Sequence, residues 1–241
     1  MNRPILLICS CINVFAPSKL FEPNIRKSQY LNSLVYFLTK SQISRIIVVE
    51  NTNSNWVSEE VLNLAKLNNK IIEVILFQAD IQMARKHTIG YSHFEMVFEA
   101  IQKSKIFQKS DSLVVMDGRH IIKNINYIYN KLENGKCAFI PEITRFQRNN
   151  LCDIRLYMIT SEIFLKYIWP RRFELSMKRD EWAEALLDNI LKSKKFKFNK
   201  LPTLPRIIGT QGSTGVSWDG NNFFKYHLKL FVIWIFNLLK Y

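Results

Sequence analysis

The first half of the chain alternates short apolar runs with segments of helical spacing. The continuous run Ile5–Ile12 is typical of a strand that is covered on both faces of a sheet. Similar runs are Arg45–Glu50, Ile71–Phe77 and Ser112–Met116, and the segments with helical spacing are residues 25–40, 57–67 and 90–104. Strict alternation of strands and helices predicts an α/β fold, with a Rossmann-type, mostly parallel sheet and helices on both faces.

The second half is less regular but shows no linker and no internal repeat. Helices are expected over residues 123–133, 161–168 and 179–191, and strands over 137–140 and 153–159. An amphipathic helix is expected from about residue 222 to the end. We therefore expect a single domain over residues 1–220, followed by a C-terminal helix over 221–241.

Glycine is scarce, and its placement excludes two common nucleotide-binding loops. Only 7 of 241 residues are glycine, and the first is Gly90. An N-terminal G-x-G-x-x-G dinucleotide fingerprint is therefore absent, and the sequence contains no G-x-x-x-x-G-K-[ST] phosphate loop. The four cysteines form no C-x-x-C pair, which leaves a zinc site without support.

The chain is strongly basic, with a formal net charge of +14. A positive field of this size attracts nucleic acid, anionic lipid and phosphorylated small molecules alike. The richness in Lys, Asn and Ile also fits an AT-rich genome, in which case the charge would indicate no partner. Charge alone leaves these alternatives open.

Polar residues follow three of the predicted strands, where ligands bind in open parallel sheets. Glu50 and Asn51 follow the second strand, and Gln78 and Asp80 follow the third. The fourth is followed by the sequence Asp117-Gly118-Arg119-His120, which combines a carboxylate, a flexible backbone point and two potential cations. A planar guanidinium such as that of Arg119 suits two-pronged phosphate binding. Such polar residues can also simply cap turns.

Two further segments could bind an anion. Arg85, Lys86 and His87 precede Gly90 and the expected start of a helix, and Glu95 lies one turn into that helix. The segment Gly209–Gly215 offers glycines and hydroxyls to a ligand. An ordinary basic loop and a surface turn are the alternatives.

Several short motifs along the chain resemble those of one enzyme family. They are Arg26…Gln29-Tyr30…Leu34, Val48-Val49-Glu50-Asn51, Gly90-Tyr91…Glu95, Gly118-Arg119-His120 and Gly212-Ser213-Thr214-Gly215. In this order they resemble bacterial glycosyltransferases of capsule and lipopolysaccharide clusters, which have a GT-A-like fold. Several members carry Gly-Arg-Tyr where most GT-A enzymes carry Asp-x-Asp, and here His120 replaces the Tyr.

The resemblance implies a nucleotide-sugar donor over the strand ends of residues 1–120 and an acceptor bound by residues 121–220. Donor contacts are expected from Glu50, Asn51, Arg85, Lys86, Gly90, Glu95, Gly118, Arg119 and His120, and acceptor-side contacts from Gly212, Ser213 and Thr214. Asp117 supplies a single carboxylate, whereas a divalent ion needs several oxygen ligands. We expect no cofactor and a metal-independent or weakly metal-dependent transfer, because positive side chains can stabilise the leaving nucleoside diphosphate instead.

An inverting transferase also needs a carboxylate that deprotonates the acceptor hydroxyl. Asp153 and Glu181 lie in the acceptor half and are the first candidates. Asp117 and Glu95 are the donor-side alternatives. Acidic residues near a helix start, such as Glu181, also simply favour the helix dipole.

The C-terminal segment, residues 223–241, mixes lysines with Phe, Leu, Ile and Trp234. Such a helix suits the surface of an anionic bilayer, although a helix packed on the core is the alternative. We expect a cytoplasmic protein, peripheral on the inner face of the inner membrane, with a glycan or lipid-linked acceptor. The rival hypothesis is a non-catalytic protein that binds nucleic acid or membrane through its basic surface, Lys192–Lys200 above all.

Overall fold

The computed structural model describes residues 3–14, 22–139, 152–176, 182–193, 195–210, 217–219 and 226–228. A seven-stranded sheet with the strand order β3-β2-β1-β4-β7-β6-β8 runs through its centre. Its strands are β1 (Ile5–Ser10), β2 (Arg45–Glu50), β3 (Ile71–Leu76), β4 (Ser112–Asp117), β6 (Ala138–Phe139), β7 (Leu156–Thr160) and β8 (Asn199–Lys200). Strands β3, β2, β1 and β4 are mutually parallel, and β7 runs antiparallel to both of its neighbours. The predicted mostly parallel sheet is confirmed.

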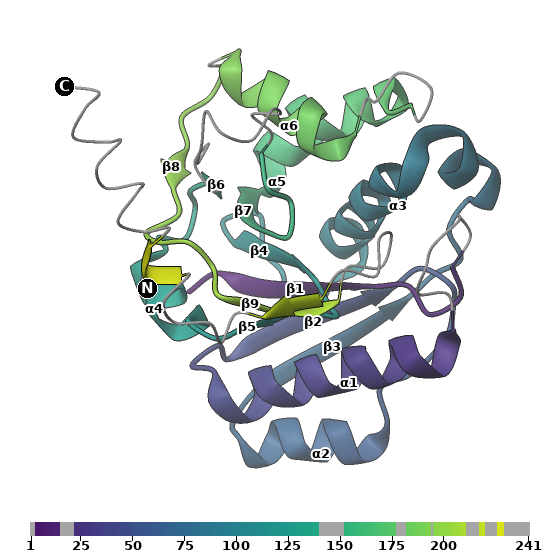
Figure 1. Ribbon diagram of the computed structural model, residues 1–241, viewed down its shortest axis with the longest axis vertical. Helices are drawn as coiled ribbons and strands as arrows, with labels where there is room; N and C mark the ends of the chain where they lie inside the picture. The colour runs from purple at the N-terminus through teal and green to yellow at the C-terminus, as the bar shows by residue number, and fades with distance from the viewer. Residues whose placement is uncertain are drawn as a thin grey trace.

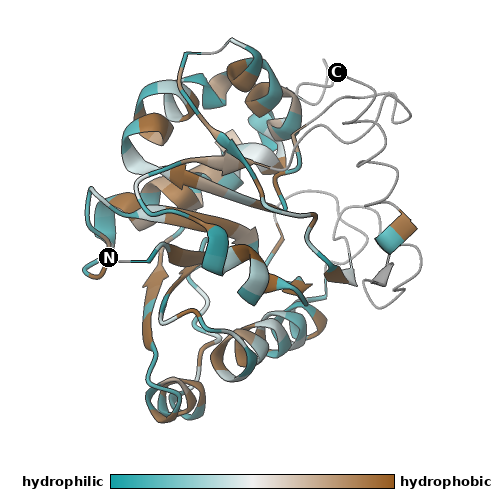
Figure 2. Ribbon diagram, turned by 90° about the vertical axis from the view of Figure 1, so that its left-hand side faces the viewer, coloured by the Kyte–Doolittle hydropathy of each residue, from teal (hydrophilic) through white to brown (hydrophobic). Residues whose placement is uncertain are grey.

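Helices cover both faces of this sheet, as predicted (Figure 1). One face carries α1 (Pro23–Lys40), α2 (Glu59–Leu67) and α4 (Ile125–Lys131). The other carries α3 (Ile81–Lys103), α5 (Ser161–Ile163), the π-helical turn η1 (Phe164–Ile168), the 3₁₀ segment η2 (Trp169–Glu174) and α6 (Ala183–Lys192). The central strands are largely brown in Figure 2, whereas the flanking helices carry both colours, as expected of amphipathic elements.

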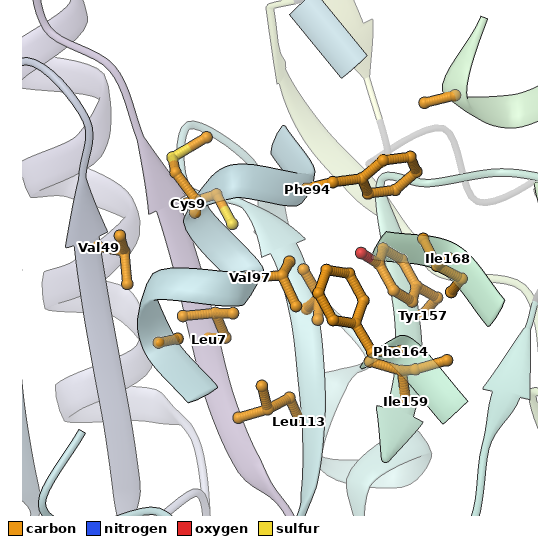
Figure 3. Close-up of a cluster of buried hydrophobic side chains, with 14 of the residues drawn as sticks. Leu7, Cys9, Val49, Phe94, Val97, Leu113, Tyr157, Ile159, Phe164 and Ile168 are labelled. Carbon is orange, nitrogen blue, oxygen red and sulfur yellow. The ribbon is translucent and has the colours of Figure 1, made fainter. Parts of the chain in front are cut away.

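The alternating side chains of β1 divide the core into two layers. Leu7 and Cys9 point toward α3, and Leu6 and Ile8 point toward α1. Figure 3 shows the first layer, in which Phe94 and Val97 of α3 lie among residues of the sheet and of η1. All six residues of β1 are buried, which explains why its sequence is continuously apolar.

Helix α1 is positioned by its ends and by one buried stripe. Pro23 occupies the first turn, where its missing N–H costs no hydrogen bond. Tyr30, Leu34, Phe37 and Leu38 are buried at helical spacing against the sheet. Arg26 lies on the same stripe, one turn before Tyr30, and is also buried. This places a cation beneath the end of β1.

Helix α3 differs most from its prediction, because it starts at Ile81 rather than at Gly90. Asp80 caps it by accepting a hydrogen bond from the Met83 N–H at 3.0 Å. The helix is kinked at His87 and Thr88, where Thr88 has φ 75° and ψ 170°. The segment expected to bind an anion, with a basic loop as the alternative, is thus the end of one helical stretch and the start of the next.

A second, three-stranded sheet was not predicted. Its strands are β5 (Ile121–Ile122), β9 (Ile207–Thr210) and β10 (Ser217–Asp219), and β9 pairs antiparallel with both others. The strands have two to four residues each, so their periodicity is too weak to detect in the sequence. The sheet brings β9 alongside the turn that follows β4.

The remaining predictions meet the structure in part. Strands β6 and β7 are confirmed with shorter bounds, and Asp153 lies three residues before β7 rather than opening it. Helix α6 is confirmed from Ala183 onward. Of the predicted C-terminal helix only residues 226–228 are described, and these are helical. Among the described helices, none combines the length and the apolar character that crossing a bilayer requires.

Candidate functional site

The strand order reverses between β1 and β4, and this point marks the candidate site. From β1 the chain proceeds outward to β2 and β3, and it then crosses back to place β4 on the other side of β1. Ligands of open α/β sheets bind at the carboxyl ends of the strands beside such a reversal. The turn Asp117–His120 follows β4 at this position.

Gly118 allows this turn to lie directly on β1. Its N–H donates to the Cys9 carbonyl at 2.9 Å. A Cβ atom on Gly118 would lie 2.5 Å from Ile8 Cγ2 and 2.9 Å from the Cys9 oxygen. Close backbone approach therefore requires glycine here.

Asp117 and Arg119 form an ion pair within the turn. Arg119 Nη2 lies 2.8 Å from Asp117 Oδ2, and the Arg119 N–H donates to Oδ1 at 3.2 Å. The Arg119 side chain is 8% exposed and that of Asp117 is 30% exposed. Burial opposes the charged form of Asp117, but the charges of Arg119 and His120 outweigh it and hold the pKa of the Asp117 carboxyl below its usual range. Both groups are thus ionised at neutral pH.

His120 follows in the turn and is almost fully buried, at 1% exposure. Its backbone is held, because Ser33 Oγ donates to the His120 carbonyl at 2.7 Å. Its ring packs against β9, where a Cβ atom on Gly209 would lie 2.8 Å from His120 Cδ2. Among the described residues, neither ring nitrogen has a hydrogen-bond partner, and Nδ1 lies 3.7 Å from Asp117 Oδ2. Burial lowers the pKa of His120, so the imidazole is mostly neutral at pH 7.

A second carboxylate–guanidinium pair adjoins the first. β7 lies beside β4 with Leu156 opposite Met116, so the residues just before β7 face the turn after β4. Arg155 Nε donates to both oxygens of Asp153, at 2.8 Å and 3.0 Å. The charges of both residues act on His120. The structure thus brings the predicted base Asp153 to the predicted donor site, engaged by an arginine that sequence reasoning missed.

Glu50 and Asn51 lie at the end of the neighbouring strand β2. The buried Glu50 carboxylate accepts four hydrogen bonds: from the N–H groups of Ile12, Thr52 and Ser54 and from Thr52 Oγ1. It ties the segment after β1 to the segment after β2, and its oxygens already have partners. Asn51 is 1% exposed, and its Oδ1 has no hydrogen-bond partner. Asn51 is therefore the better ligand candidate of the two.

Arg26 and Tyr30 of α1 also belong to the site. The sequence analysis named them only as part of a motif and assigned them no binding or catalytic role. Arg26 Nε donates to the Cys11 carbonyl at 2.7 Å, and Arg26 Nη2 donates to Tyr30 Oη at 3.2 Å. The Tyr30 hydroxyl also interacts with Arg119. Burial raises the pKa of Tyr30 to about 12, so the phenol stays protonated. Their spacing of four on one helix face was the available signal.

The candidates on α3 are divided among different surroundings. Arg85 and Lys86 are exposed in the first part of the helix, before the kink. A Cβ atom on Gly90 would lie 2.7 Å from Ala183 Cβ, so this glycine permits close packing against α6. Burial raises the pKa of Glu95 to about 7, and its charged neighbours are Asp80, Glu99 and Arg172. Gly90 thus serves the packing of α3 against α6.

His93 of α3 is linked to the site through Tyr157 and Asp117. Its Nε2 lies 3.1 Å from Tyr157 Oη, beneath the sheet end. Burial lowers the pKa of His93 to about 4, against an opposing effect of Asp117. This imidazole is therefore neutral at physiological pH.

Four predicted site residues fall outside the described part of the chain: Glu181, Gly212, Ser213 and Thr214. Within the described ranges, no three His, Cys, Asp or Glu side chains gather closely enough to hold a metal ion. Arg119 and Arg155 can instead offer N–H donors to an anion that displaces their carboxylate partners, Asp117 and Asp153.

One cavity lies away from this site. It measures about 470 Å³ and lies at the opposite edge of the sheet, between the start of β4, the end of β7 and β8. Lys109, Lys136, Lys197, Phe196 and Phe198 are among its lining residues. We place the site at the Asp117–His120 turn, because a strand-order reversal and unpartnered buried polar atoms coincide there.

Comparison with known proteins gives loose structural likenesses. No protein-family model and no curated protein matches the sequence. The chain is similar to the apo form of the glycosyltransferase GlyE of Streptococcus pneumoniae, with 13% identity over 83% of this chain and 45% of that one and a TM-score of 0.48. It therefore spans less than half of that protein.

Two other solved structures are similar to a comparable degree. A nucleoside-diphosphate-sugar pyrophosphorylase from Vibrio cholerae shares 12% identity over 81% of this chain and 90% of its own, with a TM-score of 0.44. An active-site mutant of LgtC shares 10% identity over 78% of this chain and 69% of its own, with a TM-score of 0.41. Because all three TM-scores lie below 0.5, the case for a function rests on the residues of this chain.

Proposed function

We propose that the protein is a glycosyltransferase that moves a sugar from a nucleotide-sugar donor to a surface-glycan acceptor, such as lipopolysaccharide, capsule or a lipid-linked sugar. One observation carries the proposal. Arg119, Arg155 and His120 lie together at the strand-order reversal, where the diphosphate of a donor would meet them. The motif resemblance over Gly118-Arg119-His120 supports the same assignment.

In this proposal Arg119 and Arg155 stabilise the negative charge that a divalent ion stabilises in a metal-dependent transferase. Transfer of the sugar leaves negative charge on the departing nucleoside diphosphate. Arg119 can offer two parallel N–H donors to a phosphate, and its burial strengthens that interaction. Asn51 Oδ1 can accept a hydrogen bond from the nucleoside. The proposed transfer requires no metal and no other cofactor.

Asp153 and Glu181 remain the proposed bases for the acceptor hydroxyl, with Asp117 as the donor-side alternative. A base must be ionised and within reach of the hydroxyl. Arg155 holds the Asp153 carboxylate at the proposed donor site. Asp153 can reach the acceptor hydroxyl once a bound anion draws Arg155 away. We further propose that residues 221–241 attach the protein to the cytoplasmic face of the inner membrane, and that nucleic acid is not a partner.

The proposal is tested by the melting temperature of the protein with UDP, GDP, CDP, CMP and dTDP, each in EDTA and in Mn²⁺. A ligand that binds only the native state raises the melting temperature. We expect one nucleotide to give a selective shift that EDTA does not abolish and that the Arg119→Ala variant loses. Lys66→Ala on α2 is the matched control, because it removes an exposed cation far from the turn.

A shift that appears only with Mn²⁺ would contradict the metal-independent mechanism. The absence of any nucleotide effect would contradict the donor site. Binding of a single-stranded oligonucleotide that falls steeply with salt would then favour the rival, nucleic-acid-binding function.

A further inference from the structure

The Arg119 guanidinium and the His120 imidazole both face one oxygen of the Asp117 carboxylate. Asp117 Oδ2 lies 2.8 Å from Arg119 Nη2 and 3.7 Å from His120 Nδ1. Arg119 makes the hydrogen bond, and the His120 ring stands behind it without a partner on either nitrogen. An imidazole that is 1% exposed and unpartnered is uncommon, because burying a polar group without a hydrogen bond costs stability.

The ring of His120 is fixed in this position rather than free to turn away. Gly209 of β9 packs against its Cδ2 edge, and Ser33 of α1 holds its backbone carbonyl. The His120 N–H donates to the Asp117 carbonyl at 3.2 Å, which sets the distance between the two side chains. The His120 ring therefore stays beside Asp117 even when the Arg119 side chain turns away.

A bound diphosphate would compete with Asp117 for Arg119. The guanidinium that turns to a phosphate leaves the Asp117 carboxylate, which has only 30% of its side chain exposed to water. A half-buried carboxylate without a counter-charge is costly. The nearest group that can supply a positive charge is the His120 imidazole.

We propose that His120 replaces Arg119 at Asp117 when a donor binds, by taking one proton from solvent onto Nδ1, so that donor binding is coupled to proton uptake. The proton forms an N–H bond on the imidazole, and the resulting imidazolium donates to Asp117 Oδ2. No other bond changes. The inference rests on the proposed donor site and adds a proton-linked regulation to it.

The charges that face His120 agree with this direction. Asp117 and Arg119 come from its own turn, and Asp153 and Arg155 come from the segment before β7. Ser33 from α1 and Gly209 from β9 carry no charge. In the free protein burial lowers the pKa of His120, and the two arginines add to that effect against the opposing charges of Asp117 and Asp153, so the ring is mostly neutral. Occupying Arg119 with an anion removes one opposing positive charge and adds negative charge, and both changes favour the imidazolium.

Calorimetry with intact nucleotide sugars measures the coupling directly. UDP-glucose, GDP-mannose, CDP-glucose and dTDP-glucose are suitable probes, because their diphosphate diesters do not titrate between pH 5 and 8. The probe that binds is titrated at pH 7 in buffers of different ionisation enthalpy. We expect an uptake that approaches one proton, and an affinity that rises by up to about tenfold for each unit by which the pH falls.

His120→Gln keeps a polar side chain of similar size that cannot be charged. Binding of the nucleotide sugar to this variant should therefore show no proton uptake. His93→Gln is the matched control. His93 is also buried and also senses Asp117, but its pKa of about 4 keeps it neutral in both states. Uptake should survive in His93→Gln.

A second measurement does not depend on the folding of any His120 variant. The chain has four histidines, so their imidazole signals in the wild-type protein can be resolved by nuclear magnetic resonance. The His120 signal should move from the neutral to the charged form when the nucleotide sugar is added at pH 7.

The outcomes separate this inference from the proposed function. Binding without proton uptake, or uptake that persists in His120→Gln, overturns the role of His120 and leaves the donor site standing. A failure of every nucleotide sugar to bind overturns both.

Discussion

Arg119 turns back onto Asp117, two residues earlier in the same turn, and the two side chains pair at 2.8 Å. The pair lies where the strand order reverses between β1 and β4. An arginine held in this way is already desolvated and oriented before any ligand arrives. Little of its side-chain freedom is then lost on binding, and lost freedom is one of the main costs of recognition.

Arg119→Ala is expected to lower donor affinity by about 10- to 100-fold, because hydrogen bonds to a charged group contribute about 1.5 to 3 kcal/mol. Arg119→Lys should recover part of the loss, since it restores the charge but not the planar fork. The donor affinities of both variants are measured by calorimetric titration with the nucleotide sugar that the wild type binds.

A double variant separates phosphate binding from simple repulsion by Asp117. Arg119→Ala leaves the Asp117 carboxylate uncompensated beside the ligand. Adding Asp117→Asn removes that charge. Affinity that stays low in the double variant indicates a direct role for Arg119, and affinity that returns to the wild-type value would refute it.

Gly118→Ala is expected to destabilise the protein by about 1 to 3 kcal/mol, because overpacking forces the backbone to shift. The new Cβ would lie 2.5 Å from Ile8 Cγ2 and 2.9 Å from a main-chain oxygen of the central strand. Urea unfolding monitored by circular dichroism gives the free energy of unfolding. Ser110→Ala, at an exposed position, is the control. A variant as stable as the wild type would show that the turn does not lie against β1.

The strands and helices that carry a strong period were predicted almost residue by residue, and β2 has the predicted bounds. Residues just after these strands were therefore assigned to the correct edge of the sheet. Arg155 was missed because its role depends on the pairing of β7 with β4. The start of α3 was misplaced because the kink at His87 and Thr88 and the glycine at position 90 interrupt the helical pattern in the middle of the helix.

Glu50 shows the limit of assigning function to polar residues after strands. Its position predicts a ligand contact, but its four hydrogen bonds to residues 12, 52 and 54 are structural. A carboxylate here can accept from every donor that surrounds it, whereas an amide would place its own N–H groups against some of them.

Glu50→Gln is therefore expected to lower the free energy of unfolding by about 2 to 3 kcal/mol, the cost of leaving buried donors unsatisfied. Asn51→Ala should instead weaken donor binding with a smaller effect on stability, because Oδ1 has no partner to lose. Thermal melting and nucleotide titration of the two variants give the comparison. The reverse pattern would exchange their assigned roles.

His93 makes the stability of the fold depend on pH over a defined window. Burial lowers its pKa in the folded protein to about 4, whereas an unfolded histidine titrates near 6.5. Between these values the unfolded chain binds the proton that the folded chain excludes, so stability falls as the pH falls from 6.5 toward 4. The full contribution amounts to about 3 kcal/mol.

Urea unfolding of the wild type and of His93→Gln at pH 7 and at pH 4.5 tests this prediction. The wild type is expected to lose more stability than the variant over this range, because only the wild type carries the buried neutral imidazole. The comparison is made between proteins that share every other titrating group, including Asp117. Equal losses in the two proteins would mean that His93 is protonated in the folded state, and its contact with Tyr157 Oη at 3.1 Å would then be a hydrogen bond from an imidazolium.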